Sequence, residues 1–494
     1  MFLNINEYKD KVKACWIGKN IGGTMGTPYE GKREVLDIKG FITQKGEVLP
    51  NDDLDLQLVW LYALEHIGPQ NITAESLGEF WTSFILPYWN EYGICKVNMN
   101  RGIKAPASGD WDNDFWKDSN GAWIRTEIWA CVAPGIPNLA VKYSMADAMV
   151  DHGAGEGTFA AMFVSAMQSS AFVLDDIFDC INVGLKCIPK NSRMAQSINI
   201  VLDCYKNGKT WLEARNIILE TNKDIGDGWF QAPSNVAYAV IGLLYGEGDF
   251  KKSMITAINC GDDTDCTGAT VGATLGLLHG MKGIPTDWCE YIGDDIVTVC
   301  VPKHTNFKMQ APKTCTELTE RVVELCGHVL YAYNITADNK YFHKNIIELT
   351  DGETTPKAEQ LQRIETAINK RIVPILDNIK PYTVSASCTL CDVDVTPDVK
   401  PVVKPNTEIN YKMVINSHWF MEGKPTVLKI NYYTPDGVEV LGDRNVMITP
   451  VGDFTAKTNF TVKIGDVTSD IKVIVELTAP GRASTLYVPV MILA

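Results

Sequence analysis

Small residues recur at every fourth position in two distant stretches of this 494-residue chain. The two rows are Ala14, Gly18, Gly22 and Gly26, and Gly268, Gly272, Gly276 and Gly280. In a helix this spacing places one small residue per turn on a single face. Because glycine costs about 1 kcal/mol per site in a helix interior, we expect close helix–helix packing to offset that cost. Lys11, Lys13 and Lys19 interrupt the first row, which excludes a membrane-spanning pair.

Acidic residues cluster at residues 51–57 and again at residues 261–267. Each cluster directly precedes an apolar pattern with helical spacing, at 58–64 and at 269–278. Carboxylate and hydroxyl oxygens are the ligands that Mg²⁺ and Mn²⁺ prefer, so the clusters indicate a metal site. The alternative is a pair of solvated helix N-caps, because Asp and Asn are favoured there.

Glu30 follows the first row of small residues, within residues 27–31. If the two glycine faces pack on each other, Glu30 lies close to Asp263 and Asp265. The packing hypothesis therefore predicts a third acidic element beside the two clusters. Without that packing, Glu30 is an ordinary exposed residue after a helix.

Several motifs, in order over residues 8–345, resemble those of the ADP-ribosylglycohydrolase family, of the dinitrogenase-reductase-activating glycohydrolase type. The matching segments are residues 22–31, 51–53, 120–122, 132–135, 152–153 and 260–266. The resemblance implies an all-α catalytic domain with a centre of two Mg²⁺ ions at the bottom of a cleft. Mn²⁺ is the alternative metal.

The resemblance also implies roles for individual residues. The metal-ligand positions are Asn51, Asp52, Asp53, Asp263, Asp265 and Cys266. Glu30 stands where the family has a glutamate that reaches toward metal and substrate, and Glu30 or Asp53 is the expected catalytic group.

Two of these positions depart from the family pattern, which usually has Thr or Ser at both. Asn51 still offers an amide oxygen, whereas the Cys266 thiol is a soft, poor ligand for Mg²⁺. The departures indicate a divergent subfamily, whose substrate need not be an ADP-ribosylated protein.

The expected substrate contacts come from three regions. An aromatic and polar stretch at 88–129 has no clean period and predicts either a loop that lines the cleft or a packed surface loop. Glycines at 153–157 precede a helical pattern, which favours a backbone cradle for a diphosphate. No strand pattern precedes them, so a dinucleotide-binding Rossmann motif is a poor fit. The candidate substrate-binding residues are Asn120, His152, Gly155, Gly157 and Trp229.

The pattern changes after about residue 385. Helical spacing at 54–62, 139–146, 160–171 and 237–245 gives way to short alternating runs rich in Val, Ile, Thr and Tyr. The runs are 408–415, 426–432, 438–441, 456–462, 471–477 and 485–492. We predict a helical domain at 1–385, with its core at 8–345 and a helical extension to 385. A β-sandwich of immunoglobulin-like type follows at 386–494.

Composition excludes other classes of function. A net charge of −15 argues against nucleic-acid and anionic-membrane partners. The N-terminus lacks the pattern of a signal peptide, so we expect a cytoplasmic protein whose 14 cysteines are mostly buried thiols. A CxxC spacing at 388–391 has no further ligands to complete a zinc site. The sequence leaves the oligomeric state open.

We therefore expect a divalent-metal-dependent glycosyl hydrolase that cuts an ADP-ribosyl or related ribosyl or furanosyl linkage at the anomeric carbon. Its substrate is a small molecule or a protein-linked ribosyl group. One alternative is a non-catalytic protein that binds ADP-ribose or a sugar through a degenerate metal site. Another is a glycosidase that acts on a small glycoside without ADP-ribose.

Overall fold

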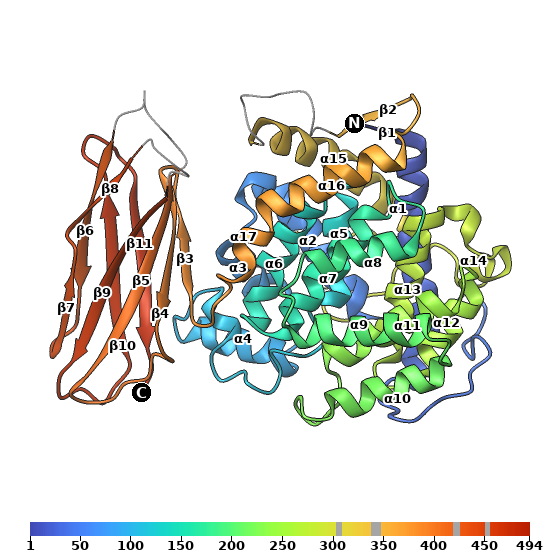
Figure 1. Ribbon diagram of the computed structural model, residues 1–494, viewed down its shortest axis with the longest axis horizontal. Helices are drawn as coiled ribbons and strands as arrows, with labels where there is room; N and C mark the ends of the chain where they lie inside the picture. Colours follow the sequence, from blue (N-terminus) through green and yellow to red (C-terminus); the bar gives the residue numbers. More distant parts are fainter. Residues whose placement is uncertain (303–308, 337–346, 418–424, 450–454) are drawn as a thin grey trace.

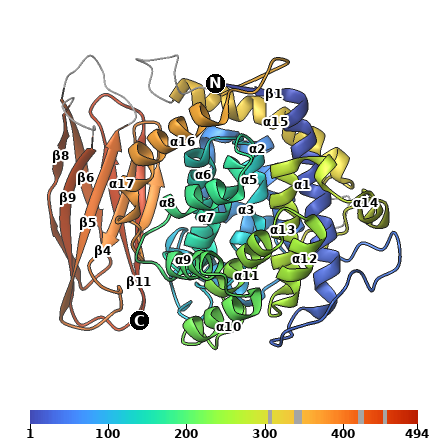
Figure 2. The same cartoon turned by 45° about the vertical axis from the view of Figure 1, so that its right-hand side comes forward.

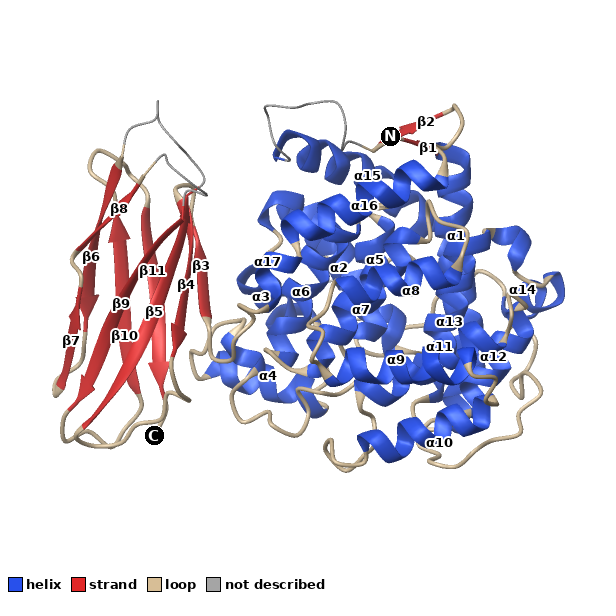
Figure 3. Cartoon of the chain, viewed as in Figure 1, coloured by secondary structure: helices blue, strands red, loops and turns tan. Residues whose placement is uncertain are grey.

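The computed structural model shows a helical part followed by a β-sandwich (Figure 1, Figure 3). It describes residues 1–302, 309–336, 347–417, 425–449 and 455–494. The helices are α1 Ile5–Gly26, α2 Asp52–Ile67, α3 Ala74–Phe84, α4 Asn90–Asn100, α5 Glu127–Cys131, α6 Pro137–His152, α7 Glu156–Ser170, α8 Ile177–Lys186, α9 Arg193–Lys206, α10 Trp211–Asn222, α11 Ala232–Tyr245, α12 Phe250–Asn259, α13 Thr264–His279, α14 Thr286–Ile292, α15 Cys315–Thr336, α16 Lys357–Arg371 and α17 Val373–Leu376. The patterns at 54–62, 139–146, 160–171 and 237–245 lie in α2, α6, α7 and α11, so these helices are confirmed.

Helices α1 and α13 pack against each other through their glycine faces. A Cβ atom added to Gly18 would lie 2.2 Å from the carbonyl oxygen of Gly272, and one added to Gly22 would lie 2.1 Å from the same group of Gly268. Neither contact tolerates a side chain, because the neighbouring atoms are backbone. The predicted close packing of the two rows is confirmed, and it brings the end of α1 to the start of α13.

The helical part is not purely α-helical. Strand β1 (Phe2–Asn4) pairs in parallel with β2 (Glu348–Thr350), which ties the N-terminus to the segment before α16. All 14 cysteines lie in the described part of the chain, and each is a free thiol, as the sequence indicated. Among the described residues, no helix combines the length and apolar character needed to cross a bilayer.

The C-terminal part consists of two antiparallel sheets. Its strands are β3 Val384–Ser387, β4 Cys391–Pro397, β5 Thr407–Ser417, β6 Thr426–Tyr433, β7 Val438–Gly442, β8 Asn445–Ile448, β9 Thr455–Ile464, β10 Ile471–Thr478 and β11 Thr485–Ile492. One sheet has the order β11-β10-β6-β8 and the other β3-β4-β5-β9-β7. Alternate residues of these strands are buried between the sheets, as in β10, so a sandwich is confirmed. The sequence missed the four-residue strands β3 and β8 and the longer strand β4.

The sandwich lies beside the helical part in both views (Figure 1, Figure 2), and it docks on the segment that follows α4, which Figure 1 labels. The backbone N–H of Tyr382 donates to the Asp110 carboxylate at 2.8 Å, and the Trp111 and Tyr382 rings lie 5.2 Å apart. Trp111 and Ile103 join the apolar core of the sandwich rather than that of the helices. The change from helix to strand falls between α17 and β3.

Candidate metal centre

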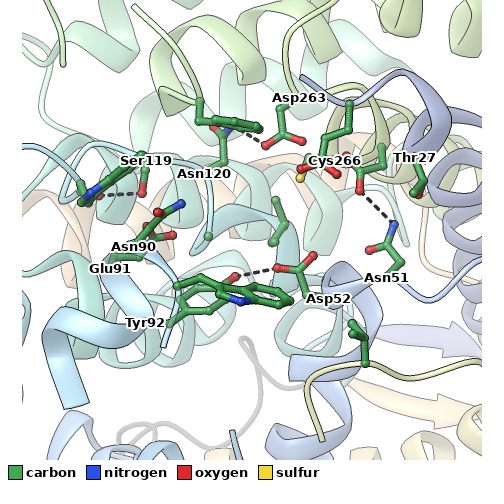
Figure 4. Close-up of a pocket in the computed structure, with 18 of the residues that line it drawn as sticks. Thr27, Asn51, Asp52, Asn90, Glu91, Tyr92, Ser119, Asn120, Asp263 and Cys266 are labelled. Atoms are coloured by element: carbon green, nitrogen blue, oxygen red, sulfur yellow. Dashed lines mark hydrogen bonds between the residues drawn. The ribbon is translucent and has the colours of Figure 1, made fainter. Parts of the chain in front are cut away.

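The acidic residues meet at a cavity of about 330 Å³ that lies beside the termini of three helices. Helices α2 and α13 begin there, and α1 ends there. Figure 4 shows Asn51, Asp52, Asp263 and Cys266 turned toward this cavity. We call Glu30, Asp52, Asp53, Asp263, Asp265 and Cys266 the acidic centre.

The two clusters begin their helices in different ways. Asn51 is the N-cap of α2, and its side-chain oxygen accepts the backbone N–H of Asp53 at 2.7 Å. Asp263 is the N-cap of α13, but its side chain makes no capping hydrogen bond. The N-cap interpretation therefore holds for Asn51, while the Asp263 carboxylate stays available to the cavity. Both helices direct the positive end of their dipole toward the centre.

Glu30 is held beside Asp263 by the backbone. The N–H of Gly31 donates to the carbonyl of Asp262 at 3.1 Å, and the N–H of Asp262 donates to the carbonyl of Lys32 at 2.7 Å. Asp262 itself turns away and accepts from Phe230 N–H and Asn235 Nδ2. Burial, followed by the charges of Asp263 and Asp52, raises the pKa of Glu30 to about 7. The proximity of Glu30 to Asp263 follows from the glycine packing.

The carboxylates form two groups that share one residue. Ligand atoms of Asp53, Asp265 and Cys266 lie within 4.8 Å of one another, and so do those of Glu30, Asp263 and Asp265. One oxygen of each of Asp53, Asp263 and Asp265 is buried without a hydrogen-bond partner among the described residues. Buried polar atoms are nearly always paired, so such oxygens require an explanation.

Burial and mutual repulsion make the centre unfavourable as it stands. The pKa values of Asp53 and Asp265 are raised well above their ordinary range, by burial first and by neighbouring carboxylates, whereas Lys19 opposes the rise for Asp53. A divalent cation held by these carboxylates would reduce this repulsion and satisfy the unpaired oxygens. The donor set, mostly hard oxygens in two adjoining groups, fits two such ions.

Neighbouring side chains orient the carboxylates. The Tyr92 hydroxyl donates to Asp52 at 3.1 Å, and Asn120 Nδ2 donates to Asp263 at 2.6 Å. The Asn120 oxygen is also occupied, since it accepts from Trp123 Nε1 at 3.0 Å. Asn120 thus fixes the rotamer of Asp263 from the cavity wall.

A buried lysine lies behind the centre. Lys19 Nζ is 3.6 Å from Asp53 and 3.1 Å from Glu127, and it donates to the carbonyl of Ile124 at 2.7 Å. Burial acts to lower the Lys19 pKa, but Glu127 and Asp53 outweigh it and raise that pKa. Lys19 therefore stays charged and holds Asp53 in place on the side away from the cavity. Asp53 does not line the cavity, whereas Glu30 does.

Cys266 occupies the cavity wall as a neutral thiol. Its Sγ donates to the Asp53 carboxylate at 3.5 Å. Burial and the surrounding carboxylates raise its pKa well above the ordinary thiol value. In the absence of a cation the thiol is therefore a hydrogen-bond donor rather than a thiolate ligand.

The other predicted substrate residues lie behind the cavity or beside it. His152 is buried, and a Cβ atom added to Gly157 would lie 2.1 Å from its ring. The same addition to Gly155 would meet the carbonyl of Lys117 at 2.3 Å. Trp229 stacks against Arg33, whose guanidinium lies 3.8 Å from the ring centroid. Their roles in substrate binding stay predictions.

The sequence did not single out several residues that line the cavity. Trp89, Glu91 and Trp116 come from the aromatic stretch at 88–129, and Phe230 comes directly after Trp229. Part of that stretch is helix α4 rather than loop, yet its aromatic side chains do reach the cavity. The aromatic composition was the available signal, but it could not select individual residues.

One comparison with known proteins identifies the family of this chain. The family model described as ADP-ribosylglycohydrolase matches residues 4–326, which include every residue of the acidic centre. The chain belongs to the ADP-ribosylglycohydrolase family. Membership places it among hydrolases that act on glycosyl bonds.

A solved structure titled "ADP-ribosylglycohydrolase-related protein complex" is similar over 66% of this chain and 99% of its own, with 18% identity and a TM-score of 0.45. A search among curated proteins gives no significant match. The ADP-ribosylglycohydrolase model ends before β3, so it does not extend to the sandwich.

Proposed function

We propose that this protein is a divalent-metal-dependent glycosyl hydrolase that cleaves an ADP-ribosyl or related ribosyl or furanosyl linkage at the anomeric carbon. One observation carries the proposal: Asp263 and Asp265 line the cavity, and each has a buried carboxylate oxygen without a hydrogen-bond partner among the described residues, while ligand atoms of Asp53 and Asp265 lie within 4.8 Å of each other. A cavity of about 330 Å³ is of the size that small-molecule sites have.

Two ions fit the two carboxylate groups, with Asp265 between them. Glu30 and Asp263 would complete one site, and Asp53 and Cys266 the other, while Asp52 lines the same cavity and is a further ligand for an ion there. We propose Mg²⁺ as the physiological metal and Mn²⁺ as the alternative, because Cys266 is a softer donor than a hydroxyl. When bound, such ions polarise sugar hydroxyls and water.

The chain's own residues supply the rest of the chemistry. Glu30 lines the cavity, and its carboxylate is the group that would accept a proton from the attacking water. The surrounding carboxylates favour the positive charge that develops on a sugar ring as the glycosidic bond breaks. The aromatic rings of Trp89, Trp116 and Phe230 line the same cavity and offer faces for a sugar or base.

We further propose that the catalytic part is of the dinitrogenase-reductase-activating glycohydrolase type. The leaving group is then an amino-acid side chain or a small-molecule aglycone. The support is the ordered set of motifs and the position of Glu30 beside Asp263.

Calorimetric titration with Mg²⁺ and Mn²⁺, together with turnover of ribosyl substrates, tests the proposal. Asp52→Asn and Asp263→Asn should each weaken ion binding and abolish turnover. Asp55→Asn is the matched control, because this acid of the same cluster accepts the backbone amides of Val299 and Cys300 instead of facing the cavity. Unchanged ion affinity in both test variants would refute the proposed centre.

Cys266 favours the alternative of a non-catalytic protein that binds ADP-ribose or a sugar, since it weakens one metal site. The same experiments separate the two. A binder gives saturable heat with ADP-ribose and no turnover of any ribosyl substrate in Mg²⁺ or Mn²⁺. A hydrolase releases the free sugar and the aglycone.

A further inference from the structure

Two cysteines stand opposite each other at the turn between β3 and β4. The register of these antiparallel strands pairs Ala386 with Val393, so the pair that follows toward the turn is Cys388 and Cys391. The backbone N–H of Cys388 donates to the carbonyl of Cys391 at 3.0 Å, which closes the hairpin at these two residues. Figure 1 shows β3 and β4 as neighbouring strands on the side of the sandwich toward the helical part. The CxxC spacing is therefore a cross-strand pair of thiols.

Both side chains belong to the inner face of the sandwich. Cys391 is buried in the apolar core of the sandwich, and Cys388 is partly buried and packs against that core. Directly opposed residues on one face of an antiparallel pair have Cβ atoms about 4.5–5.5 Å apart. A disulfide has its Cβ atoms about 3.5–4.5 Å apart. A small adjustment of the turn is thus enough to join the two sulfur atoms.

The two thiols differ in their access to solvent. Cys391 is 1% exposed, whereas Cys388 is partly exposed. Burial, followed by the neighbouring Cys388 thiol and Asp392, raises the pKa of Cys391 to about 12. Cys388 is therefore the sulfur that a reagent in solution reaches, and Cys391 stands behind it as a second, protonated thiol. An accessible thiol beside a resolving cysteine is the arrangement of a redox-sensitive pair.

The other cysteines lack either the access or the neighbour. All 14 lie in the described part of the chain, and only Cys289 and Cys388 are partly exposed. The groups that act on the Cys289 pKa include no other thiol. Cys15 and Cys131 do adjoin each other, since Cys131 adds to the burial that raises the Cys15 pKa, but both are completely buried. Access and a neighbouring thiol coincide at Cys388.

We propose that Cys388 and Cys391 form a reversible disulfide, with a small-molecule disulfide such as oxidised glutathione as the oxidant. The Cys388 thiolate attacks one sulfur of glutathione disulfide, forms a mixed disulfide and releases one glutathione thiolate. That thiolate takes the proton of Cys391, whose sulfur attacks the Cys388 sulfur and displaces the second glutathione. The second glutathione takes up the proton that Cys388 first released. Two protein thiols are oxidised, and one glutathione disulfide is reduced to two thiols.

The bond would fasten β3 to its sheet. This strand spans four residues, stands at the edge of its sheet and is hydrogen-bonded to β4. It begins two residues after Tyr382, which docks on Asp110. A covalent link at the other end of β3 holds the strand that leads from the helical part into the sandwich. Short edge strands open locally with little cost, so the bond should suppress that opening.

The test uses the full-length chain and oxidised glutathione. Protein is reduced, freed of reductant and incubated with glutathione disulfide, and its remaining thiols are alkylated before peptide mapping by mass spectrometry. Cys388 and Cys391 should both be lost to alkylation and should appear as one intramolecular disulfide, which dithiothreitol reverses. Cys289, accessible without a partner, should keep glutathione as a mixed disulfide. Cys15 and Cys131, adjoining without access, should stay free thiols.

Two variants assign the order of the steps. Cys391→Ser should retain glutathione on Cys388, because no second sulfur displaces it. Cys388→Ser should leave Cys391 unmodified, because that thiol is buried. Amide hydrogen exchange at 384–387 should be slower in oxidised than in reduced wild type, and it should not slow on oxidation of either variant.

The wild-type chain decides the pairing without the variants. Glutathione that stays on wild-type Cys388 with no bond to Cys391 overturns the proposal, and so do two thiols that remain reduced at every ratio of oxidised to reduced glutathione. A bond from Cys388 to a second copy of the chain, seen as a covalent dimer, overturns it as well. Unchanged hydrogen exchange at 384–387 after the bond has formed overturns the fastening of β3.

Discussion

The two sides of the cavity satisfy their buried charges in opposite ways. In the relay network, which consists of Glu91, His152, Asp151 and Arg125, Arg125 balances Asp151 and also Asp147, and His152 lies between Asp151 and Glu91. In the acidic centre, Asp53 forms an ion pair with Lys19, whereas Asp263 and Asp265 each keep an oxygen without a hydrogen-bond partner among the described residues. Charged groups that are paired within the fold serve its structure or orient a neighbour, whereas unpaired like charges mark the place where an external cation belongs.

The largest expected effect is the loss of the balancing cation in the relay network. Arg125→Met should lower the free energy of unfolding by about 3–5 kcal/mol, because it leaves two buried aspartates without their counter-charge. Denaturant unfolding measures the change. The loss should be the same with and without Mg²⁺, since Arg125 belongs to the paired side. If Mg²⁺ recovered the lost stability of the variant, Arg125 would belong to the acidic centre instead.

The next effect concerns the packing that assembles the acidic centre. Gly272→Ala should cost about 1–3 kcal/mol, because the new Cβ atom would lie 2.1 Å from the carbonyl oxygen of Gly18. Gly327→Ala, in the middle of α15 with no atom within 4 Å of the added Cβ, is the control and should be neutral or stabilising. Thermal unfolding of both variants, followed by Mg²⁺ titration, is the measurement. Equal stability of the two variants would contradict the close contact.

Replacement of one carboxylate in the acidic centre should raise the free energy of unfolding instead of lowering it. In metal-free protein, Asp265→Asn should raise the free energy of unfolding by about 1 kcal/mol, the equivalent of one pKa unit, because it relieves repulsion from Asp263 and Asp53. With saturating Mg²⁺, wild type should become the more stable of the two. If the variant destabilises the metal-free protein, its carboxylate is not under electrostatic stress.

The stability of the metal-free protein should depend on pH, and bound Mg²⁺ should weaken that dependence. The pKa values of Glu30 and Asp262 are raised to about 7 from ordinary values near 4. Between those values the folded state binds more protons than the unfolded chain, so stability should fall as pH rises from about 4 to about 7. Saturating Mg²⁺ should flatten this slope, which thermal unfolding at several pH values would reveal. A metal-free protein that gains stability over this range would contradict the assignment.

The smallest expected effect concerns the choice of ion. Cys266→Thr replaces a soft donor by a hard one, so it should tighten Mg²⁺ binding by several-fold and reduce the preference for Mn²⁺. Calorimetry and the ratio of Mg²⁺- to Mn²⁺-supported turnover measure this. An identical ratio in both proteins would mean that Cys266 does not contact the metal.

The contact between α1 and α13 could be predicted because glycines at a helical period need a partner that approaches equally closely. The position of Glu30 beside Asp263 follows from that single inference. Most strands of the sandwich were also predictable, since their alternation is long enough to see. Strands β3 and β8 span only four residues each, too few for a clear alternation.

The relay network could not be predicted in the same way. Glu91 stands in a stretch without helical period, and His152 stands at the end of a helix that is mostly buried on all sides. Neither segment contains a sequence signal for contact with the other, because the contact between Glu91 and His152 depends on how α4 packs beside α6. The signal that was available, a histidine before a glycine-rich turn, pointed to a phosphate cradle instead.

The pairing of Gly22 with Gly268 also sets the order in which the catalytic part can be completed during synthesis. At about 5 to 20 residues per second, a ribosome needs roughly 12 to 50 s to make the chain between these two glycines. During that interval the glycine face of α1 has no partner helix. Glu30 and Asp52 are already synthesised, but Asp263 and Asp265 are not. A release of the chain before α13 emerges would leave half of the acidic centre attached to an unfinished core.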